Sequence, residues 1–260
     1  MLVYPQLGSG ALSQFPVRRR RKLRTVANYT ADGRAIKLPD PAGAVTEWSL
    51  QYAGLTDDEA TALEQFFAAA EGTLNGFTFL DPTSNLLAWS DHLNEAAWQR
   101  GPLVTVADGI SDPTGGMRAW HAANTGEGAQ TIGQTIAAPA GYLYCLSAYA
   151  RSTQVVTVTM LLGANRTDRE IGARWTRIVA AAHGDPATES ITFGLELPAG
   201  AAIDVFGIQA EPQGGASAYQ SSTSGGVYEN ARLRDDALTI VDTDVNCHSC
   251  TVNIIHANHL

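Results

Sequence analysis

The sequence predicts a mainly β protein in which a small α+β domain accompanies a β-sandwich. Only 17% of the 260 residues are charged, and 25 are glycines. Short runs rich in Val, Ile and Thr recur between turn residues, which is typical of strands rather than helices. The hydrophobic fraction of 45% excludes disorder of the whole chain, and this length allows one or two domains.

The first clear strand covers Thr46 to Ala53. Trp48, Leu50 and Tyr52 alternate there with polar residues. Because side chains of a strand point alternately to its two faces, this period of two predicts a strand with one buried face.

A helix is predicted directly after this strand. Thr56 is placed as its N-cap, and Glu59 three residues later completes a capping box. The apolar residues that recur at helical spacing are Ala60, Leu63, Phe67 and Ala70. Phe66 flanks this stripe, and Gly72 is well placed to end the helix. A short strand and a turn follow over residues 76–82.

From Asn85 to about Tyr219 the chain alternates short strands with turns and shows no helical stretch. The clearest strands are Tyr142–Ala150, Val155–Leu162, Trp175–Ala180, Ser190–Leu197 and Ala202–Gln209. Such regular spacing predicts a β-sandwich.

The last part of the chain holds a linker, Ser221–Gly226, and two strands, Ala237–Asp242 and Thr251–His256. Two strands are too few to fold alone. We therefore expect them to return to the N-terminal domain, so that residues 1–84 plus 221–260 form one domain. Residues 85–220 would then be an inserted sandwich.

Charge is distributed unevenly. The net charge is -9, which argues against a general nucleic-acid binder. Six cations nevertheless cluster near the start, at Arg18, Arg19, Arg20, Arg21, Lys22 and Arg24. We interpret them as a solvated loop or as a face that meets an acidic partner.

No signal peptide or membrane span is visible in the sequence. The protein is therefore expected to be made in the cytoplasm and not to insert into a membrane.

The region from Trp48 to Pro82 resembles the N-terminal domain of phage distal tail proteins. The resemblance rests on the strand Trp48-x-Leu50-x-Tyr52, on the helix that begins after Thr56, and on the strand at Phe77-x-Phe79. It implies a ring-forming domain, commonly a hexamer, that contacts tail-tube and tail-tip proteins. The expected location is then the tail tip of a virion assembled in the host cytoplasm.

The second region resembles a jelly-roll carbohydrate-binding module. The residues that carry this similarity are Asn85–Ser90, Trp98, Asp112–Pro113, Gln134, Tyr144–Arg151, Trp175–Arg177, Phe206–Glu211 and Ser217–Tyr219. It implies either a site for host-surface glycan or a structural decoration without a ligand.

Sugars are bound by aromatic faces and by planar polar groups. Trp120 follows a Gly-Gly turn in a polar context, so its indole is the candidate stacking surface. Arg151 and Gln209 recur in the family pattern and are the candidate hydrogen-bonding groups. Trp120 could equally be a core residue, and Arg151 could equally be a structural arginine that holds a loop. Core packing is the interpretation we favour for the other tryptophans, Trp89, Trp98 and Trp175.

Catalysis is not predicted. Neither a carboxylate pair of the kind that cleaves glycosides nor a nucleophile or phosphate-binding motif stands out. Cys145 lies in an apolar strand, which favours an inert buried thiol.

No cofactor is expected either. Cys247, Cys250, His256 and His259 have the ligand types of a zinc site, but their strand context favours ordinary strand residues.

The leading hypothesis is therefore a structural component of a phage-like tail tip that displays a module for host-surface carbohydrate. The alternative is a free-standing lectin or a non-catalytic carbohydrate-binding module of a polysaccharide-degrading system.

Overall fold

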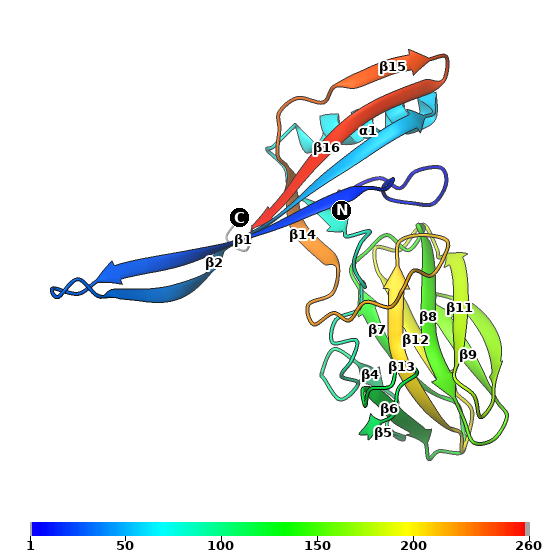
Figure 1. Ribbon diagram of the computed structural model, residues 1–260. Helices are drawn as coiled ribbons and strands as arrows, with labels where there is room; N and C mark the ends of the chain where they lie inside the picture. Colours follow the sequence, from blue (N-terminus) through cyan, green and yellow to red (C-terminus); the bar gives the residue numbers. More distant parts are fainter. Residues whose placement is uncertain (1, 258–260) are drawn as a thin grey trace. The chain divides into compact units, whose positions relative to one another are not determined.

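The computed structural model describes residues 2–257, and these divide into two units (Figure 1). The terminal unit combines residues 2–8, Ser13–Phe79 and residues 228–257. The sandwich unit combines Ser9–Leu12 and Leu80–Val227. Antiparallel strands dominate both units, so the predicted fold class is confirmed.

The terminal unit is built on one six-stranded sheet. Its strands are β1 (Val17–Tyr29), β2 (Ala35–Leu55), β3 (Phe77–Leu80), β14 (Val227–Leu233), β15 (Ile240–Asp244) and β16 (Cys247–Ala257). They follow the order β1-β2-β16-β14-β3, and β15 also pairs with β16. The C-terminal strand β16 pairs antiparallel with β2, with Ile254 opposite Trp48. The buried Trp48, Leu50 and Tyr52 confirm the predicted alternation along β2.

The single helix of the described residues, α1 (Asp57–Ala70), begins as predicted. The Thr56 hydroxyl accepts a hydrogen bond from the Glu59 amide, and the Glu59 carboxylate accepts one from the Thr56 amide. Its buried residues are Ala60, Leu63, Phe66 and Ala70. The prediction that Phe67 belongs to this stripe was wrong, because Phe67 is half-exposed. Phe66, three positions after Leu63, is the buried ring instead, and it packs edge to face against Tyr4 and Phe77.

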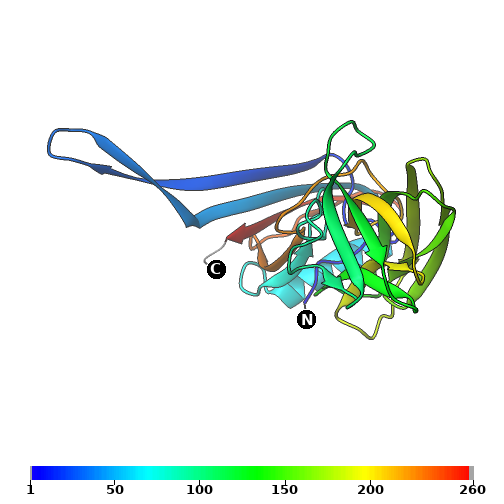
Figure 2. The same cartoon turned by 90° about the horizontal axis from the view of Figure 1, so that it is seen from below.

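Beyond the sheet, β1 and β2 continue as a two-stranded ribbon, which is drawn in blue and extends to the left in Figure 2. The pairing runs from Arg24 opposite Asp40 to Tyr29 opposite Ala35. Every residue of β1 after Val17 is exposed. The cationic tract therefore lies in a strand and not in a loop. With both faces in water, β1 lacks the alternation that would have revealed it.

The sandwich unit contains two five-stranded antiparallel sheets. The first has the order β10-β9-β12-β7-β4, and the second has the order β11-β8-β13-β6-β5. The strands of the first are β4 (Gln99–Arg100), β7 (Gln130–Ile136), β9 (Val156–Leu162), β10 (Asn165–Ile171) and β12 (Ile191–Leu197). The strands of the second are β5 (Val104–Ile110), β6 (Ala119–Asn124), β8 (Leu143–Arg151), β11 (Thr176–His183) and β13 (Ala202–Glu211). The five predicted strands correspond to β8, β9, β11, β12 and β13.

The core of the sandwich lies between these two sheets. Tyr144 of β8 meets Phe193 of β12 edge to face, with ring centres 5.3 Å apart. Leu146, Ala148 and Ala150 alternate with the outward residues of β8 and are fully buried, so they share the inner face that Tyr144 marks. Cys145 is also buried, and this burial raises the pKa of its thiol to about 11. The prediction of a buried thiol is confirmed.

The entry and exit segments of the sandwich unit run side by side. The Asp81 amide donates to the Gly226 carbonyl at 2.8 Å, and the Ser90 amide donates to the Ser222 carbonyl at 2.9 Å. Among the described residues, no helix has the length and apolar character needed to cross a membrane.

Candidate functional site

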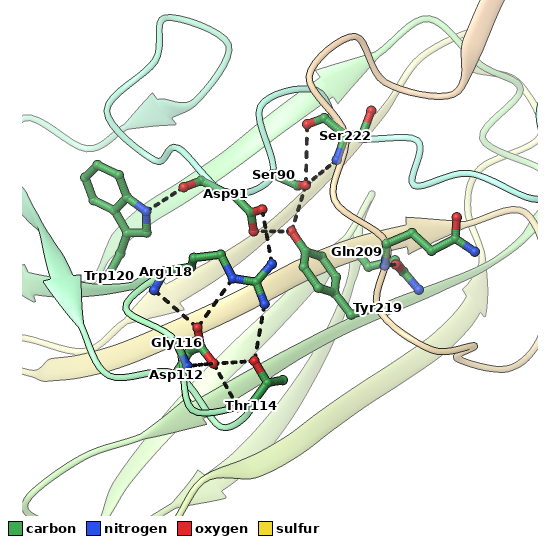
Figure 3. A network of polar contacts seen from close by, with 11 residues as sticks. Ser90, Asp91, Asp112, Thr114, Gly116, Arg118, Trp120, Gln209, Tyr219 and Ser222 are labelled. Carbon is green, nitrogen blue, oxygen red and sulfur yellow. Dashed lines mark hydrogen bonds and ion pairs between the residues drawn. The ribbon is translucent and has the colours of Figure 1, made fainter.

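The structure places Trp120 in the interior of the sandwich unit. Trp120 of β6 pairs with Val205 of β13, and Val205 pairs with Ala150 on the inner face of β8. Only 6% of Trp120 is exposed, and its indole Nε1 donates to the Asp91 carbonyl at 2.8 Å (Figure 3). The space beside it is too small for a water molecule. The expectation of an exposed indole was wrong, because β-pairing turns this side chain inward.

A polar network covers part of the opposite, outer face of the second sheet (Figure 3). Arg118 precedes β6, and its guanidinium lies 5.0 Å from the ring centre of Phe206 on β13. Its Nε lies 3.4 Å from Asp112 Oδ2, and its Nη1 lies 3.9 Å from Asp91 Oδ2. Arg118 therefore joins the loop before β6 to the segment around Asp91.

Asp112 organises the loop between β5 and β6. Its Oδ1 accepts hydrogen bonds from the Thr114 amide and hydroxyl and from the Gly116 amide, and its Oδ2 accepts one from the Arg118 amide. Burial disfavours the ionised carboxyl. These hydrogen bonds outweigh burial and hold the pKa of Asp112 well below its ordinary value. The carboxylate is thus a structural anchor of the loop.

Tyr219 holds the segment after β13 against the sheet. Gly207 has a φ of +65°, and a Cβ there would lie 3.0 Å from the Tyr219 ring, so glycine makes this close approach possible. The Tyr219 hydroxyl donates to Asp91 Oδ1 at 2.6 Å and lies 2.9 Å from the Ser90 hydroxyl. Burial, together with the bond to Asp91, raises the pKa of Tyr219 well above its usual range.

Gln209 lies under the same segment. It is 1% exposed, and its Oε1 accepts a hydrogen bond from the Gln220 amide at 2.8 Å. Its Nε2 lies 3.4 Å from both the Ser217 hydroxyl and the Ala218 carbonyl. The amide is therefore engaged in holding residues 217–220.

Arg151 belongs to an accessible cluster on the outer face of the second sheet. Its Nε donates to Asp204 Oδ2 at 2.9 Å, and its guanidinium lies 4.7 Å from the ring centre of Trp175. Nδ1 of His121 lies 2.9 Å from Asp204 Oδ1. The side chains of His121, Arg151 and Asp204 remain 45%, 29% and 20% exposed, and Trp175 is half-exposed. We call these four residues the Arg151 cluster.

The structure brings two of the three predicted site residues to one face. Arg151 pairs with Asp204, and Gln209 pairs with Ser147, so both occupy the outer face of the second sheet, opposite to Trp120. Sequence reasoning missed Asp204 and His121. The available signal was a polar residue between two buried apolar ones, Ile203 and Val205, which marks an outward position in a strand.

The other three tryptophans differ in how far they are buried. Trp98 is buried, and its Nε1 donates to the Trp89 carbonyl, so core packing is confirmed for Trp98. The same prediction was wrong for Trp89, which is 38% exposed. It was also wrong for Trp175, which precedes β11 and packs its ring against Arg151.

The cysteines near the C-terminus lie within β16. Cys250 is buried and Cys247 is half-buried, with the Thr243 hydroxyl 3.2 Å from the Cys247 sulfur. His256 packs against the ring of Tyr228, and His259 lies outside the described residues. In residues 2–257, no three His, Cys, Asp or Glu side chains are grouped to hold a metal ion.

Comparison with known proteins gives structural similarities to parts of this chain. No protein-family model and no curated protein sequence matches it. Its structure is similar to the enzymatically active domain of tailspike protein 4 from bacteriophage CBA120, with 13% identity and a TM-score of 0.39. That match covers 55% of this chain but only 23% of the tailspike chain.

Two carbohydrate-binding proteins are also similar. TmCBM61, solved with β-1,4-galactotriose, gives 16% identity and a TM-score of 0.37 over 48% of this chain and 97% of its own. The CBM22-1 xylan-binding domain of Paenibacillus barcinonensis Xyn10C gives 9% identity and a TM-score of 0.40 over 55% of this chain and 97% of its own.

Proposed function

We propose that the sandwich unit binds carbohydrate through the outer face of its second sheet, at the Arg151 cluster. The observation that carries this proposal is the combination, on one accessible patch, of an aromatic ring with charged planar groups. Trp175 supplies the ring, and Arg151 and Asp204 supply the planar groups. Proteins use these two kinds of group together to recognise sugars, whose faces are apolar and whose edges carry hydroxyls.

The chemistry of each group suits a neutral sugar. The Asp204 carboxylate accepts hydrogen bonds from sugar hydroxyls, and the Arg151 guanidinium donates to them. Because these two side chains already bond each other, their geometry is set before a ligand arrives, which reduces the entropy lost on binding. In this proposal Gln209 and Trp120 support the site, Gln209 by holding residues 217–220 and Trp120 by filling the core beneath β6.

A glycan array probed with the full chain tests the proposal. Binding to at least one glycan is expected, and Trp175→Ala and Arg151→Ala should each weaken it by more than about tenfold, equivalent to about 1.4 kcal/mol. Trp89→Ala is the matched control, because it removes a partly exposed indole outside the Arg151 cluster. If the wild type binds no glycan, or if Trp175→Ala binds as well as the wild type does, the proposal is wrong.

A second function, assembly into a ring at a phage-like tail tip, is favoured by the charge of the terminal unit. The strand β1 carries six cations and no acidic residue in an acidic protein. Such an uneven distribution suits contact between copies, with tail-tube and tail-tip proteins as further partners. A hexamer is the stoichiometry we expect. Sedimentation and negative-stain microscopy of the full chain test it, and a monomer at all concentrations would exclude the ring.

A further inference from the structure

We propose that the terminal units of two copies join edge to edge, with β1 of one copy pairing with β15 of the next. This inference rests on the proposed self-assembly and names its surfaces and partner, a second copy of this chain. The two strands occupy separate edges of the same sheet (Figure 1). Within the described residues, β1 pairs only with β2, and β15 pairs only with β16. Unpaired strand edges present free backbone groups that can bind another strand.

The directions of the strands fit this pairing. The contacts β1–β2, β2–β16 and β16–β15 are all antiparallel. Three reversals make β15 run opposite to β1. A second copy that continues the sheet in the same orientation therefore presents its β15 antiparallel to the first copy's β1, and antiparallel strands pair through regular backbone hydrogen bonds.

The side chains of the two edges are complementary in charge. The five residues of β15 include Asp242 and Asp244, and the residues after Ile240 are exposed. The part of β1 beside the sheet carries the cationic tract that begins at Arg18. Within the tract, Lys22 is paired with Glu47 and Arg24 with Asp40 in the same chain. Arg18 and Arg21 are exposed and form no ion pair with a carboxylate among the described residues. Opposite charges placed across two strands stabilise their pairing.

Each edge also exposes apolar side chains. On β1, Leu23 is 85% exposed, and Val241 on β15 is 52% exposed. A two-stranded ribbon is only marginally stable in water without a further strand or a packed face. Added strands would lengthen the sheet beside the start of the ribbon and cover some of this surface.

The contact is head-to-tail, because two different edges of the same unit are used. Such a heterologous contact repeats from copy to copy and closes into a ring when the rotation between copies allows it. An assembly built in this way has one free β1 edge and one free β15 edge until it closes. Blocking either edge alone must therefore stop growth.

Two edge variants of the full chain test this head-to-tail contact, with sedimentation velocity at low salt as the measurement. The first carries Arg18→Glu with Arg21→Glu, and the second carries Val241→Lys with Asp244→Lys. We expect the wild type to assemble and each variant alone to associate more than about tenfold more weakly. A mixture of the two variants should assemble again, with the variants alternating, because the β1 edge of each variant is then opposite in charge to the β15 edge of the other.

Combining all four substitutions in one chain should restore assembly, because both charge signs are then reversed. Arg18→Lys with Arg21→Lys is the control that keeps the charge, and it should assemble as the wild type does. Circular dichroism shows whether each variant is folded, and the four-fold variant remains informative even if one pair of substitutions alone disturbs the fold.

The outcomes separate the two proposals. A wild type that stays monomeric overturns both self-assembly and the edge contact. A wild type and edge variants that all assemble overturn the edge contact alone and leave the ring in place. Self-association of either edge variant into dimers shows a symmetric contact instead and also overturns the head-to-tail arrangement.

Discussion

The indole Nε1 of Trp120 donates a hydrogen bond to the main-chain carbonyl of Asp91 at 2.8 Å. This bond and the pairing with Val205 fix the side chain between the two sheets. Trp120→Ala should therefore lower the free energy of unfolding of the sandwich unit by about 3–5 kcal/mol, the usual cost of emptying a large aromatic site. Thermal denaturation followed by near-UV circular dichroism measures the loss.

The control is again Trp89→Ala, which should cost less than about 1 kcal/mol because that side chain is partly exposed. An unchanged melting temperature for Trp120→Ala, combined with lost glycan binding, would instead make Trp120 a ligand-stacking residue.

Asp112→Asn should destabilise the sandwich unit at neutral pH by about 1.5–3 kcal/mol, because the loop between β5 and β6 loses hydrogen bonds to a charged acceptor. The folded-state pKa of Asp112 is lowered, so its stabilising contribution is present above the unfolded pKa of about 3.9 and disappears as pH falls through the folded value. The difference in melting temperature between the wild type and Asp112→Asn should shrink at acid pH. A difference that stays constant with pH would show that the charge of Asp112 is unimportant.

His248 should make the contact between β15 and α1 dependent on pH. Its Nδ1 lies 2.7 Å from Asp242 and its Nε2 lies 2.6 Å from Asp57. Hydrogen bonds to Asp57 and Asp242 raise the pKa of His248. The added stability is fully present below the unfolded pKa of about 6.5 and is lost as pH rises through the folded value.

Amide hydrogen exchange of β15, corrected for the intrinsic effect of pH, should show more protection at about pH 5.5 than at about pH 8.5. His248→Gln should remove this difference, and His183→Gln, in the sandwich unit, should leave it intact. Equal corrected protection of the wild type at both pH values would contradict the assignment.

Deleting residues 230–260 should unfold the terminal unit and leave the sandwich unit folded. The deletion removes β16, which pairs with β2 from Val45 to Leu55. Without this strand, the buried face around Trp48 loses the neighbours Val252 and Ile254. Calorimetry of the truncated chain should show the transition of the sandwich alone. Loss of the sandwich transition with retention of the other would overturn this account of the two units.

Local features of the fold were predictable from local sequence. The capping box at Thr56 and the alternation around Trp48 need only neighbouring residues, and both were identified correctly. The strand β1 was not identified, because a strand exposed on both faces shows no alternation. Its existence depends on pairing with β2, which is a tertiary property.

For the candidate site, too, one part was predictable from local sequence and the rest depends on tertiary structure. Arg151 could be selected from the sequence, but its partners come from other strands and from the turn before β11. Whether Trp120 is accessible depends on the register of β6 against β13, and β13 itself shifts register between Phe206 and Gln209. A single such shift reverses which side chains face inward. The residues that flank a tryptophan in the sequence do not reveal such a register shift.

The hydrogen bond between the Asp81 amide and the Gly226 carbonyl also bears on evolution and engineering. The chain leaves for the sandwich and returns from it at adjacent points, so a short junction between residues 81 and 226 could replace everything in between. Chain segments with adjacent ends are readily inserted, removed and exchanged. The sandwich can thus be exchanged for another module by recombination that leaves every strand pairing of β1, β2 and β16 untouched.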